Sequence, residues 1–424
     1  MSATLSGSCP YSRGVTSAPT SRARQRIRVR SRRDRAGDLL GLLPNPDQAL
    51  AWVRDGSGLV GWGEAARLEV SGPDRFAQAD AWWREFVGRL DVDDELGVPG
   101  SGPVAFISMA FADEPGDSVL IVPEVVVGRR NGVEWVTTIG TADSIPRKTP
   151  LSRPSEVRYA NGQLPVTQYR EAVREAVARM REGELGKVVL AHDLIAVTDK
   201  RLDQRFVLQG LARRYPECWS YAVDGLVGAT PELLLRRTGS VVDSRVLAGT
   251  TWPHDGISDE ELASALMSSE KNLEEHDYAI TSLADTLRPF CSTMSVDGPS
   301  VLRLPNVSHL SSDVIGTLSS SASLLHLGEA VHPTAAVGGT PRLDATRLIS
   351  QLEGMDRGRY AGPVGWIDGN GDGELGIALR CAQINGSTAR LFAGCGLVAD
   401  SDPDSEVQEA HAKMRPMREA LEGL

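Results

Sequence analysis

The sequence of 424 residues predicts an α+β fold, a large two-lobed unit of antiparallel β-sheets flanked by helices. Short apolar runs punctuated by Gly, Pro and Asp fill residues 38–150, a pattern typical of antiparallel strands. From Pro165 onward, segments with helical spacing are separated by several strands, without regular strand–helix–strand alternation. This order of elements favours large antiparallel sheets.

The elements can be placed in order along the chain from the spacing of their apolar residues. Helices are predicted around residues 76–90 and over 167–181, 204–214, 259–287, 342–352 and 404–421. Strands are predicted at 187–197, 219–226, 232–237, 240–248 and 389–397, with a hairpin that pairs 362–368 with 375–384. We expect residues 22–424 to form one unit, in which 22–160 is a strand-rich scaffold without an ionisable cluster and 165–424 is the catalytic part.

Composition indicates a cytoplasmic protein that binds neither nucleic acid nor membranes. The net charge is −11, and no apolar run approaches the length of a membrane helix. The cysteines are scattered, odd in number and never spaced as Cys-x-x-Cys, which predicts neither a disulfide framework nor a zinc site. They are Cys9, Cys218, Cys291, Cys381 and Cys395.

The first forty residues differ in composition from the rest. Residues 1–21 are rich in Ser, Thr, Gly and Pro, and we expect a disordered leader there. Arginines then occupy alternate positions from Arg22 to Arg32, which predicts an edge strand with the arginines on one face. A transit peptide and an Arg-rich module that binds nucleic acid or another surface are the alternative interpretations of this segment.

A sequence from Asp368 to Gly373 looks like the start of a calcium loop because Asp, Asn and Asp alternate with Gly. The twelfth position of such a loop should be Glu, and here it is Leu379. A strand is also predicted where the loop should lead into a helix. We therefore interpret this segment as a hairpin turn.

Five separated segments carry the functional signal. They are 186–190 (GKVVL), 228–234 (GATPELL), 247–250 (LAGT), 269–276 (SEKNLEEH), and a stretch that runs from 380–382 (RCA) through 394–396 (GCG) to 406–413 (EVQEAHAK). In this order they resemble the chorismate-utilising enzyme family over about residues 165–424. Chorismate is a dianion with an allylic hydroxyl, so its enzymes need a cation, anion-binding groups, a base and an acid.

The resemblance implies a magnesium ion held by Glu275 and Glu409, with Glu406 as an acidic residue near the metal. From the residues alone these helix positions would be solvated faces, since Glu406, Glu409 and Lys413 are spaced three and four apart. The resemblance further implies a set of substrate-binding residues. They are Gly249, Thr250, Ala336, Arg380, Gly394, Gly396 and Lys413.

The resemblance assigns the chemistry to Lys187 and Glu232. The lysine would deprotonate water that adds at ring C2, and the glutamate would protonate the departing C4 hydroxyl. From the residues alone, a lysine that opens a strand is usually a surface residue, and Pro-Glu before leucines could be a turn. The proposed roles need a lysine that can be neutral and a carboxyl that can be protonated.

Two positions predict water, not ammonia, as the nucleophile, so no glutaminase partner is expected. Anthranilate synthases have an uncharged residue in place of Lys187, and aminodeoxychorismate synthases have a lysine in place of Ala248. The His-Pro-Thr sequence from His332 resembles isochorismate synthases, and we assign His332 no catalytic step. Salicylate-forming relatives tend to have Thr in place of Ala336, so the resemblance favours isochorismate as the product.

The implied protein is thus an isochorismate synthase of menaquinone or siderophore biosynthesis, acting on chorismate as a monomer or weak dimer. A salicylate synthase, which would also eliminate pyruvate, is the alternative, and an aminating anthranilate or aminodeoxychorismate synthase component is a further one.

Overall fold

The computed structural model describes residues 26–140, 147–154, 156–252, 256–304 and 307–424. The helices are α1 (Arg75–Gly88), α2 (Val166–Arg181), α3 (Gln204–Arg214), α4 (Asp259–Ser268), α5 (Glu270–Leu287), α6 (Leu324–Val331), α7 (Arg342–Glu353) and α8 (Pro403–Glu422), with short 3-10 turns at η1 (Leu40–Leu42) and η2 (Arg288–Phe290). The strands up to residue 197 are β1 (Ile27–Arg33), β2 (Leu50–Arg54), β3 (Ser57–Trp62), β4 (Ala66–Val70), β5 (Leu90–Asp94), β6 (Val104–Ser108), β7 (Ser118–Val122), β8 (Val125–Arg130), β9 (Val133–Ile139), β10 (Arg158–Asn161) and β11 (Lys187–Val197). The later strands are β12 (Trp219–Val223), β13 (Leu226–Thr230), β14 (Leu233–Thr238), β15 (Val241–Thr251), β16 (Cys291–Leu304), β17 (Val307–Leu318), β18 (Gly339–Thr340), β19 (Pro363–Asp368), β20 (Gly373–Ile377), β21 (Cys381–Asn385) and β22 (Thr388–Leu397).

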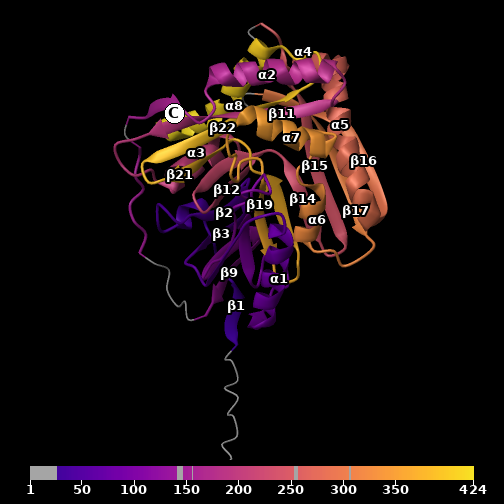
Figure 1. Cartoon of the computed structure of the whole chain (residues 1–424). Coiled ribbons are helices and arrows are strands. Elements are labelled where there is room, and N and C mark those ends of the chain that lie inside the picture. The colour runs from indigo at the N-terminus through magenta and orange to yellow at the C-terminus, as the bar shows by residue number, and fades with distance from the viewer. Residues whose placement is uncertain (1–25, 141–146, 155, 253–255, 305–306) are drawn as a thin grey trace, which may run out of the picture.

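Two large sheets organise the described residues, which confirms the predicted α+β class (Figure 1). One has 13 strands in the order β10-β11-β22-β21-β13-β12-β2-β3-β8-β9-β1-β5, with β18 beside β11. The other has nine strands in the order β16-β17-β15-β14-β20-β19-β6-β7-β4. β1 pairs with β5 in parallel, and the other described pairings are antiparallel.

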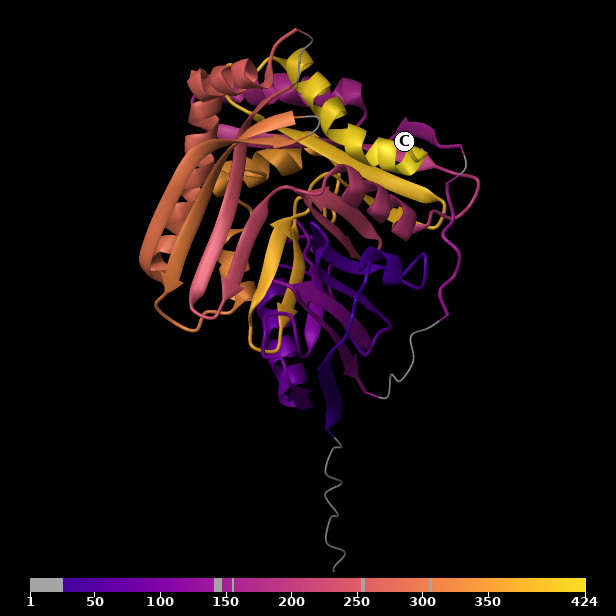
Figure 2. The same cartoon turned by 180° about the vertical axis from the view of Figure 1, so that it is seen from behind.

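Both sheets combine strands from the first 140 residues with strands from the rest of the chain (Figure 2). In the 13-stranded sheet β2 pairs with β12, and in the nine-stranded sheet β6 pairs with β19. The larger apolar core joins the two sheets, since it includes Trp52 and Tyr221 of one and Phe106 and Trp366 of the other. Helices α2, α3, α7 and α8 pack against the first sheet, and α1, α5 and α6 against the second. No helix in the described residues is long and apolar enough to cross a membrane.

The arginine-rich segment forms β1, but this strand is not at the sheet edge. It lies between β9 and β5, so the prediction of an edge strand was wrong, and β5 is the edge strand. The arginines do share an exposed face, since Val29 and Ser31 between them are buried. Their charges meet acidic residues of β5 and the turn after it, because Arg32 pairs with Asp93 and lies 3.7 Å from Glu95. The predicted leader, residues 1–21, lies outside the described residues.

Several predicted elements have the expected bounds to within one residue, including β11, α2, α3 and α7. The hairpin turn predicted at Asp368 is also confirmed, because β19 and β20 flank it and the Asp368 carboxylate accepts the N–H groups of Asn370 and Asp372. The predicted helix over 259–287 is interrupted at Ser269, whose hydroxyl caps the start of α5. The predicted strand 219–226 is two strands, β12 and β13.

Two predictions about strands after residue 287 need correction. The hairpin of β16 and β17 was missed because most residues of β16 are exposed and show no alternation of apolar and polar side chains. The strand predicted over 375–384 is two strands, β20 and β21, which belong to different sheets. The chain changes sheet at residues 378–380, where Arg380 has a left-handed φ of 50°.

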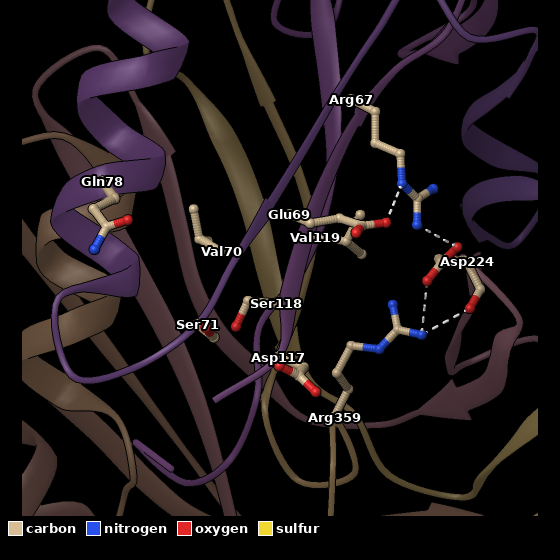
Figure 3. Close-up of a pocket in the computed structure, with 10 residues that line it drawn as sticks. All are labelled: Arg67, Glu69, Val70, Ser71, Gln78, Asp117, Ser118, Val119, Asp224 and Arg359. Carbon is tan, nitrogen blue, oxygen red and sulfur yellow. Dashed lines mark hydrogen bonds and ion pairs between the residues drawn. The ribbon is translucent and has the colours of Figure 1, made fainter. Parts of the chain in front are cut away.

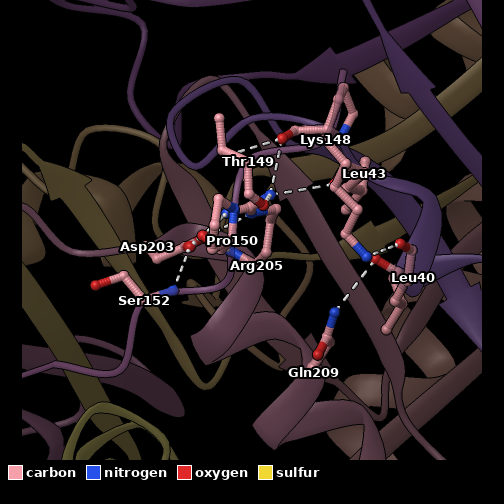
Figure 4. A network of polar contacts seen from close by, with 11 residues as sticks. Leu40, Leu43, Lys148, Thr149, Pro150, Ser152, Asp203, Arg205 and Gln209 are labelled. Atoms are coloured by element: carbon pink, nitrogen blue, oxygen red, sulfur yellow. Dashed lines mark hydrogen bonds and ion pairs between the residues drawn. The ribbon is translucent and has the colours of Figure 1, made fainter. Parts of the chain in front are cut away.

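A buried ion pair fixes the connecting segment, residues 147–154, between the two parts of the chain (Figure 4). The Arg205 guanidinium donates to both carboxylate oxygens of Asp203, at 2.9 and 2.7 Å, and both side chains are 1% exposed. Its remaining donors reach the carbonyls of Pro44, Thr149 and Pro150 at 2.8 to 3.2 Å. The pair therefore joins α3 to the connecting segment and to the loop before β2.

Candidate functional site

A cavity between the two sheets collects most of the predicted site residues. The nine-stranded sheet contributes Leu247, Ala248, Thr250 and His309, the 13-stranded sheet contributes Val189, Gly394 and Gly396, and the loops and helices contribute the rest. The predicted residues on its wall are Glu232, Thr250, Glu275, Ala336, Arg380, Gly394, Gly396 and Lys413. Gly249 precedes Thr250 in β15, and Lys187 and Glu409 reach the site through contacts with Glu275 and Lys413.

Lys187 is the first residue of β11 and is fully buried. Its Nζ lies 3.3 Å from Oε1 of Glu275, and it makes no hydrogen bond to any described residue. A buried amine without a hydrogen-bond partner is costly for folding and is a common feature of functional sites. The interpretation of Lys187 as a surface residue is therefore excluded.

Glu232 lies directly before β14 and is 4% exposed. Burial raises the pKa of its carboxyl to about 8, although nearby lysines and Arg380 oppose the shift. The carboxyl is thus predominantly protonated at neutral pH, which is the state that a general acid needs.

A chain of polar contacts joins two of the predicted substrate-binding residues through His309, which sequence reasoning missed. The Thr250 hydroxyl lies 3.1 Å from Nδ1 of His309, and Nη2 of Arg380 lies 3.4 Å from Nε2. Burial, together with the charge of Arg380, lowers the pKa of His309 well below its usual value, so the ring is neutral. Because arginine can only donate, Nε2 accepts and the Nδ1–H group points at Thr250.

Arg380 itself was predicted inside a strand, and its observed place at the change of sheet is a correction. Its left-handed backbone bends the chain away from β20, and its guanidinium lies on the cavity wall. The apolar residues on both sides of it made the two short strands look continuous.

The glycines of the site are required by close packing. Gly249 has φ of 75° and occupies a bulge in β15, where a Cβ would lie 2.9 Å from the carbonyl of Asn272. A Cβ at Gly394 would lie 2.6 Å from the carbonyl of Leu190. At Gly396 the neighbouring atoms belong to predicted functional residues, because a Cβ would overlap the Glu275 carboxylate and crowd Lys187.

The carboxylates predicted to hold magnesium, Glu275 and Glu409, and Glu406, predicted to lie near it, approach consecutive residues of β22. Glu275 of α5 contacts the Gly396 position, while Glu406 and Glu409 of α8 each have an oxygen within 4.8 Å of the Cys395 sulfur and of one another. Glu406 is 3% exposed, and its Oε2 has no hydrogen-bond partner among the described residues. Burial and the neighbouring Glu409 raise the pKa of Glu406 to about 7.

The carboxylates of Glu406 and Glu409 fit a magnesium ion. An unpaired buried carboxylate oxygen beside a second carboxylate gives the hard oxygen ligands that Mg²⁺ prefers. The Cys395 thiol donates to the carbonyl of Glu406 at 3.2 Å, and burial raises the pKa of the thiol well above its usual value, so sulfur is not the expected ligand.

Lys413 connects the carboxylates of α8 to the cavity. Its Nζ lies 2.6 Å from Oε1 of Glu409 and donates to the carbonyl of Gly394 at 3.1 Å. Burial opposes its charge, but the Glu409 carboxylate outweighs this effect and the pKa of Lys413 is raised. The residue is therefore a fixed cation on the cavity wall, suited to an anionic ligand.

Sequence reasoning also missed Tyr360 and Arg357, which line the cavity. The signal that could have found Arg357 is its spacing of four residues from Glu353 at a helix end. His332, to which we assigned no catalytic step, does not line the cavity, and its Nε2 donates to the carbonyl of Phe111 at 2.9 Å.

The prediction that residues 22–160 carry no ionisable cluster was wrong. Arg67, Glu69 and Asp117 of this part line a second cavity of about 600 Å³ together with Asp224 and Arg359 (Figure 3). The Asp224 carboxylate accepts from Arg67 at 2.9 Å and from Arg359 at 3.1 Å. The cluster escaped prediction because its members come from distant parts of the sequence.

Comparisons with known proteins agree with this geometry. The sequence profile of the family described as chorismate binding enzymes matches residues 50–422. The chain is 31% identical over 405 residues to a salicylate biosynthesis isochorismate synthase of Pseudomonas aeruginosa, covering 88% of this chain and 85% of that protein. It is 38% identical over 269 residues to the isochorismate synthase MenF of Bacillus subtilis, which is 62% of this chain and 57% of that relative's length.

A solved structure shows the same fold. The menaquinone-specific isochorismate synthase MenF from Escherichia coli superposes with a TM-score of 0.77 at 25% identity, over 93% of this chain and 94% of that one. The profile match covers the cavity, both predicted catalytic residues and all the carboxylates of α5 and α8. The chain therefore belongs to the family of chorismate-binding enzymes.

Proposed function

We propose that this protein is a magnesium-dependent isochorismate synthase, which converts chorismate into isochorismate. The observation that carries the proposal is the state of Glu232, a buried carboxyl on the cavity wall whose pKa is raised to about 8. Such a group holds a proton at neutral pH and can give it to a leaving hydroxyl. The relatives named as isochorismate synthases support the same assignment.

In the proposed reaction Lys187 takes a proton from water as the water oxygen bonds to ring C2. The ring double bond shifts, and the bond from C4 to its hydroxyl breaks. Glu232 gives its proton to this hydroxyl, which leaves as water. Lys187 has then gained one proton and Glu232 has lost one. Because one water is added and one is released, the product is an isomer of the substrate. Arg380 would hold the enolpyruvyl carboxylate, since it lies on the wall and its guanidinium is oriented by His309.

Glu275 and Glu409 would hold the magnesium ion, with Glu406 close to it. When bound, the ion would neutralise these carboxylates and attract the ring carboxylate of the substrate. Gly249, Thr250, Gly394, Gly396, Ala336 and Lys413 would complete the substrate site.

The test is incubation of the purified protein with chorismate and magnesium, followed by chromatography of the products. We expect isochorismate alone, with no change when ammonium is added. Salicylate with an equal amount of pyruvate would assign the protein to the salicylate-forming branch. Anthranilate or another aminated ring would refute the role of Lys187 as activator of water.

A further inference from the structure

A buried ion pair borders the proposed active site, since its arginine lines the cavity. Glu353 is the last residue of α7, and Arg357 follows in the loop before β19. The guanidinium donates to both carboxylate oxygens, Nε to Oε2 at 2.9 Å and Nη2 to Oε1 at 2.5 Å. The two side chains are 1% and 2% exposed, so the pair is shielded from water and its geometry is fixed.

The pair also forms hydrogen bonds with the backbone of β11, the strand that carries Lys187. Nη2 of Arg357 donates to the carbonyl of Val189 at 2.7 Å, and Oε1 of Glu353 accepts the N–H of Ala191 at 2.7 Å. Because alternate side chains of a strand point to the same face, Lys187 and Val189 lie on one face of β11. Holding the backbone at two points just beyond Lys187 therefore fixes where its side chain enters the site.

The same guanidinium also binds the segment that carries Ala336, which lies beside β11 because the N–H of Val189 donates to the carbonyl of Gly338 at 2.8 Å. Nη1 of Arg357 donates to the carbonyl of Val337, directly after Ala336, at 3.1 Å. The guanidinium also lies 4.2 Å from the centre of the Phe111 ring, a cation–π contact. The carbonyl of Phe111 accepts from His332, which lies at the start of the loop that carries Ala336. Residues 332–337 are thus tied at both ends to Arg357 or to its aromatic neighbour.

We propose that Glu353 and Arg357 form a positioning pair, which sets the distance between the Lys187 side chain and the Ala336–Val337 wall. This inference rests on the proposed function, because it assigns the pair to the step in which Lys187 activates water at C2. Neither residue supplies a proton. A displacement of about 1 Å between a base and its substrate can cost on the order of 10²-fold in rate, so the pair matters for turnover beyond its effect on stability.

The chain offers a matched control for this distinction. The Asp203–Arg205 pair (Figure 4) is equally buried and bidentate, and its arginine also donates to backbone carbonyls, but it lies at the start of α3 and neither of its residues lines the cavity. A lysine in either position keeps the charge and loses the planar fork. Arg357→Lys and Arg205→Lys should therefore destabilise the fold by similar amounts.

The experiment compares kcat, KM and melting temperature of the wild type and both lysine variants, with turnover followed as chorismate consumption in saturating magnesium. We expect kcat of Arg357→Lys to fall at least about tenfold relative to Arg205→Lys. KM should change less than kcat, because Arg380 and Lys413, which would bind the substrate carboxylates, form no hydrogen bond or ion pair with Glu353 or Arg357. Equal kcat in the two lysine variants, or a rise in KM with kcat unchanged, would overturn the proposal.

If Arg357→Lys does not fold, Glu353→Gln decides the question, because it keeps the shape of the side chain and one acceptor oxygen. A fall in kcat with a melting temperature near that of the wild type supports positioning, and an unchanged kcat overturns it. The comparison is independent of the product. If the wild type consumed chorismate but made another compound, the proposed function would fail while the ratio of kcat values would still test the pair.

Discussion

Gly396 lies so close to Glu275 that a Cβ atom at this position would overlap the Oε1 oxygen and lie 3.2 Å from Cε of Lys187. The proposed base and a proposed magnesium ligand therefore share the space that a glycine leaves open. This relationship connects a sequence motif, Gly-Cys-Gly, to the residues proposed to activate water and to hold magnesium.

Gly396→Ala should abolish most of the activity of a folded protein. The added methyl must displace Glu275 or Lys187, and we expect turnover to fall on the order of 10²-fold. Gly88→Ala at the end of α1 is the control, since a Cβ there has no neighbour within 4 Å. Turnover and melting temperature are measured for both variants. Wild-type turnover in Gly396→Ala would show that Glu275 and Lys187 can move away from the added methyl group without loss of function.

The reaction should slow as the pH rises through about 8, because Glu232 then loses the proton that it must donate. Glu232→Gln should lower the rate by about 10² to 10⁴ at every pH, as expected for removal of a general acid. The measurement is the pH dependence of kcat at saturating chorismate and magnesium. A wild-type rate that stays constant to pH 10 would exclude Glu232 as the acid.

The same carboxyl should also make the fold less stable in base. Its pKa in the folded protein is about 8 against a usual value of 4.5, so between these values the folded state holds a proton that the unfolded state lacks. The free energy of unfolding should then fall with rising pH, by at most about 1.4 kcal/mol per pH unit, and level off above pH 8. Urea unfolding of the wild type and Glu232→Gln across this range isolates the contribution, which should disappear in the variant.

Magnesium removal should stop turnover, and added magnesium should restore it. Glu409→Gln should need a higher magnesium concentration for half-maximal rate and should turn over more slowly, since an amide is a weaker ligand than a carboxylate. Glu419→Gln on the same helix is the control, because Glu419 pairs with Arg214 outside the cavity. Full activity in excess chelator would exclude the proposed metal site.

Glu374 should be among the most important single residues for stability. Its carboxylate accepts from Trp52 at 2.8 Å and Arg130 at 2.5 Å in the 13-stranded sheet, and from Arg236 at 3.2 Å in its own sheet. Glu374→Ala leaves the buried Trp52 N–H and the half-buried Arg130 without this partner, while Arg236 keeps its pair with Asp243, and should cost about 2–3 kcal/mol in the free energy of unfolding. Glu69→Ala, which removes an exposed ion pair with Arg67, should cost less than about 1 kcal/mol.

Much of the architecture could be predicted because local patterns were strong. The helical spacing of α2 gives both its bounds and its buried face, and β11 has its predicted bounds although its first seven residues are all buried, without the predicted alternation. The hairpin of β16 and β17 could not be predicted, since one of its strands faces solvent along most of its length and has no apolar period. The switch at Arg380 was also hidden, because both sheets bury their strands and the apolar run gives no sign of the change.

In the candidate site, too, some residues could be predicted from the sequence and others could not. Lys187, Glu232 and Arg380 lie in segments that could be compared with a family, and the structure places them around one cavity. His309 could not be found because it lies in the strand that was missed. Arg357 binds backbone carbonyls of distant segments. Every residue has such a carbonyl, so the sequence does not indicate which ones Arg357 binds.

The interleaving of strands in both sheets has a consequence for anyone who divides this chain. A fragment that begins at Val166 would leave β12 without β2 and β19 without β6, so two strand edges would be exposed at once. Exposed edges of this kind pair with other chains, and we expect such a fragment to aggregate when expressed alone. Supplied together, the two fragments should instead recover each other as partners, each completing both sheets of the other.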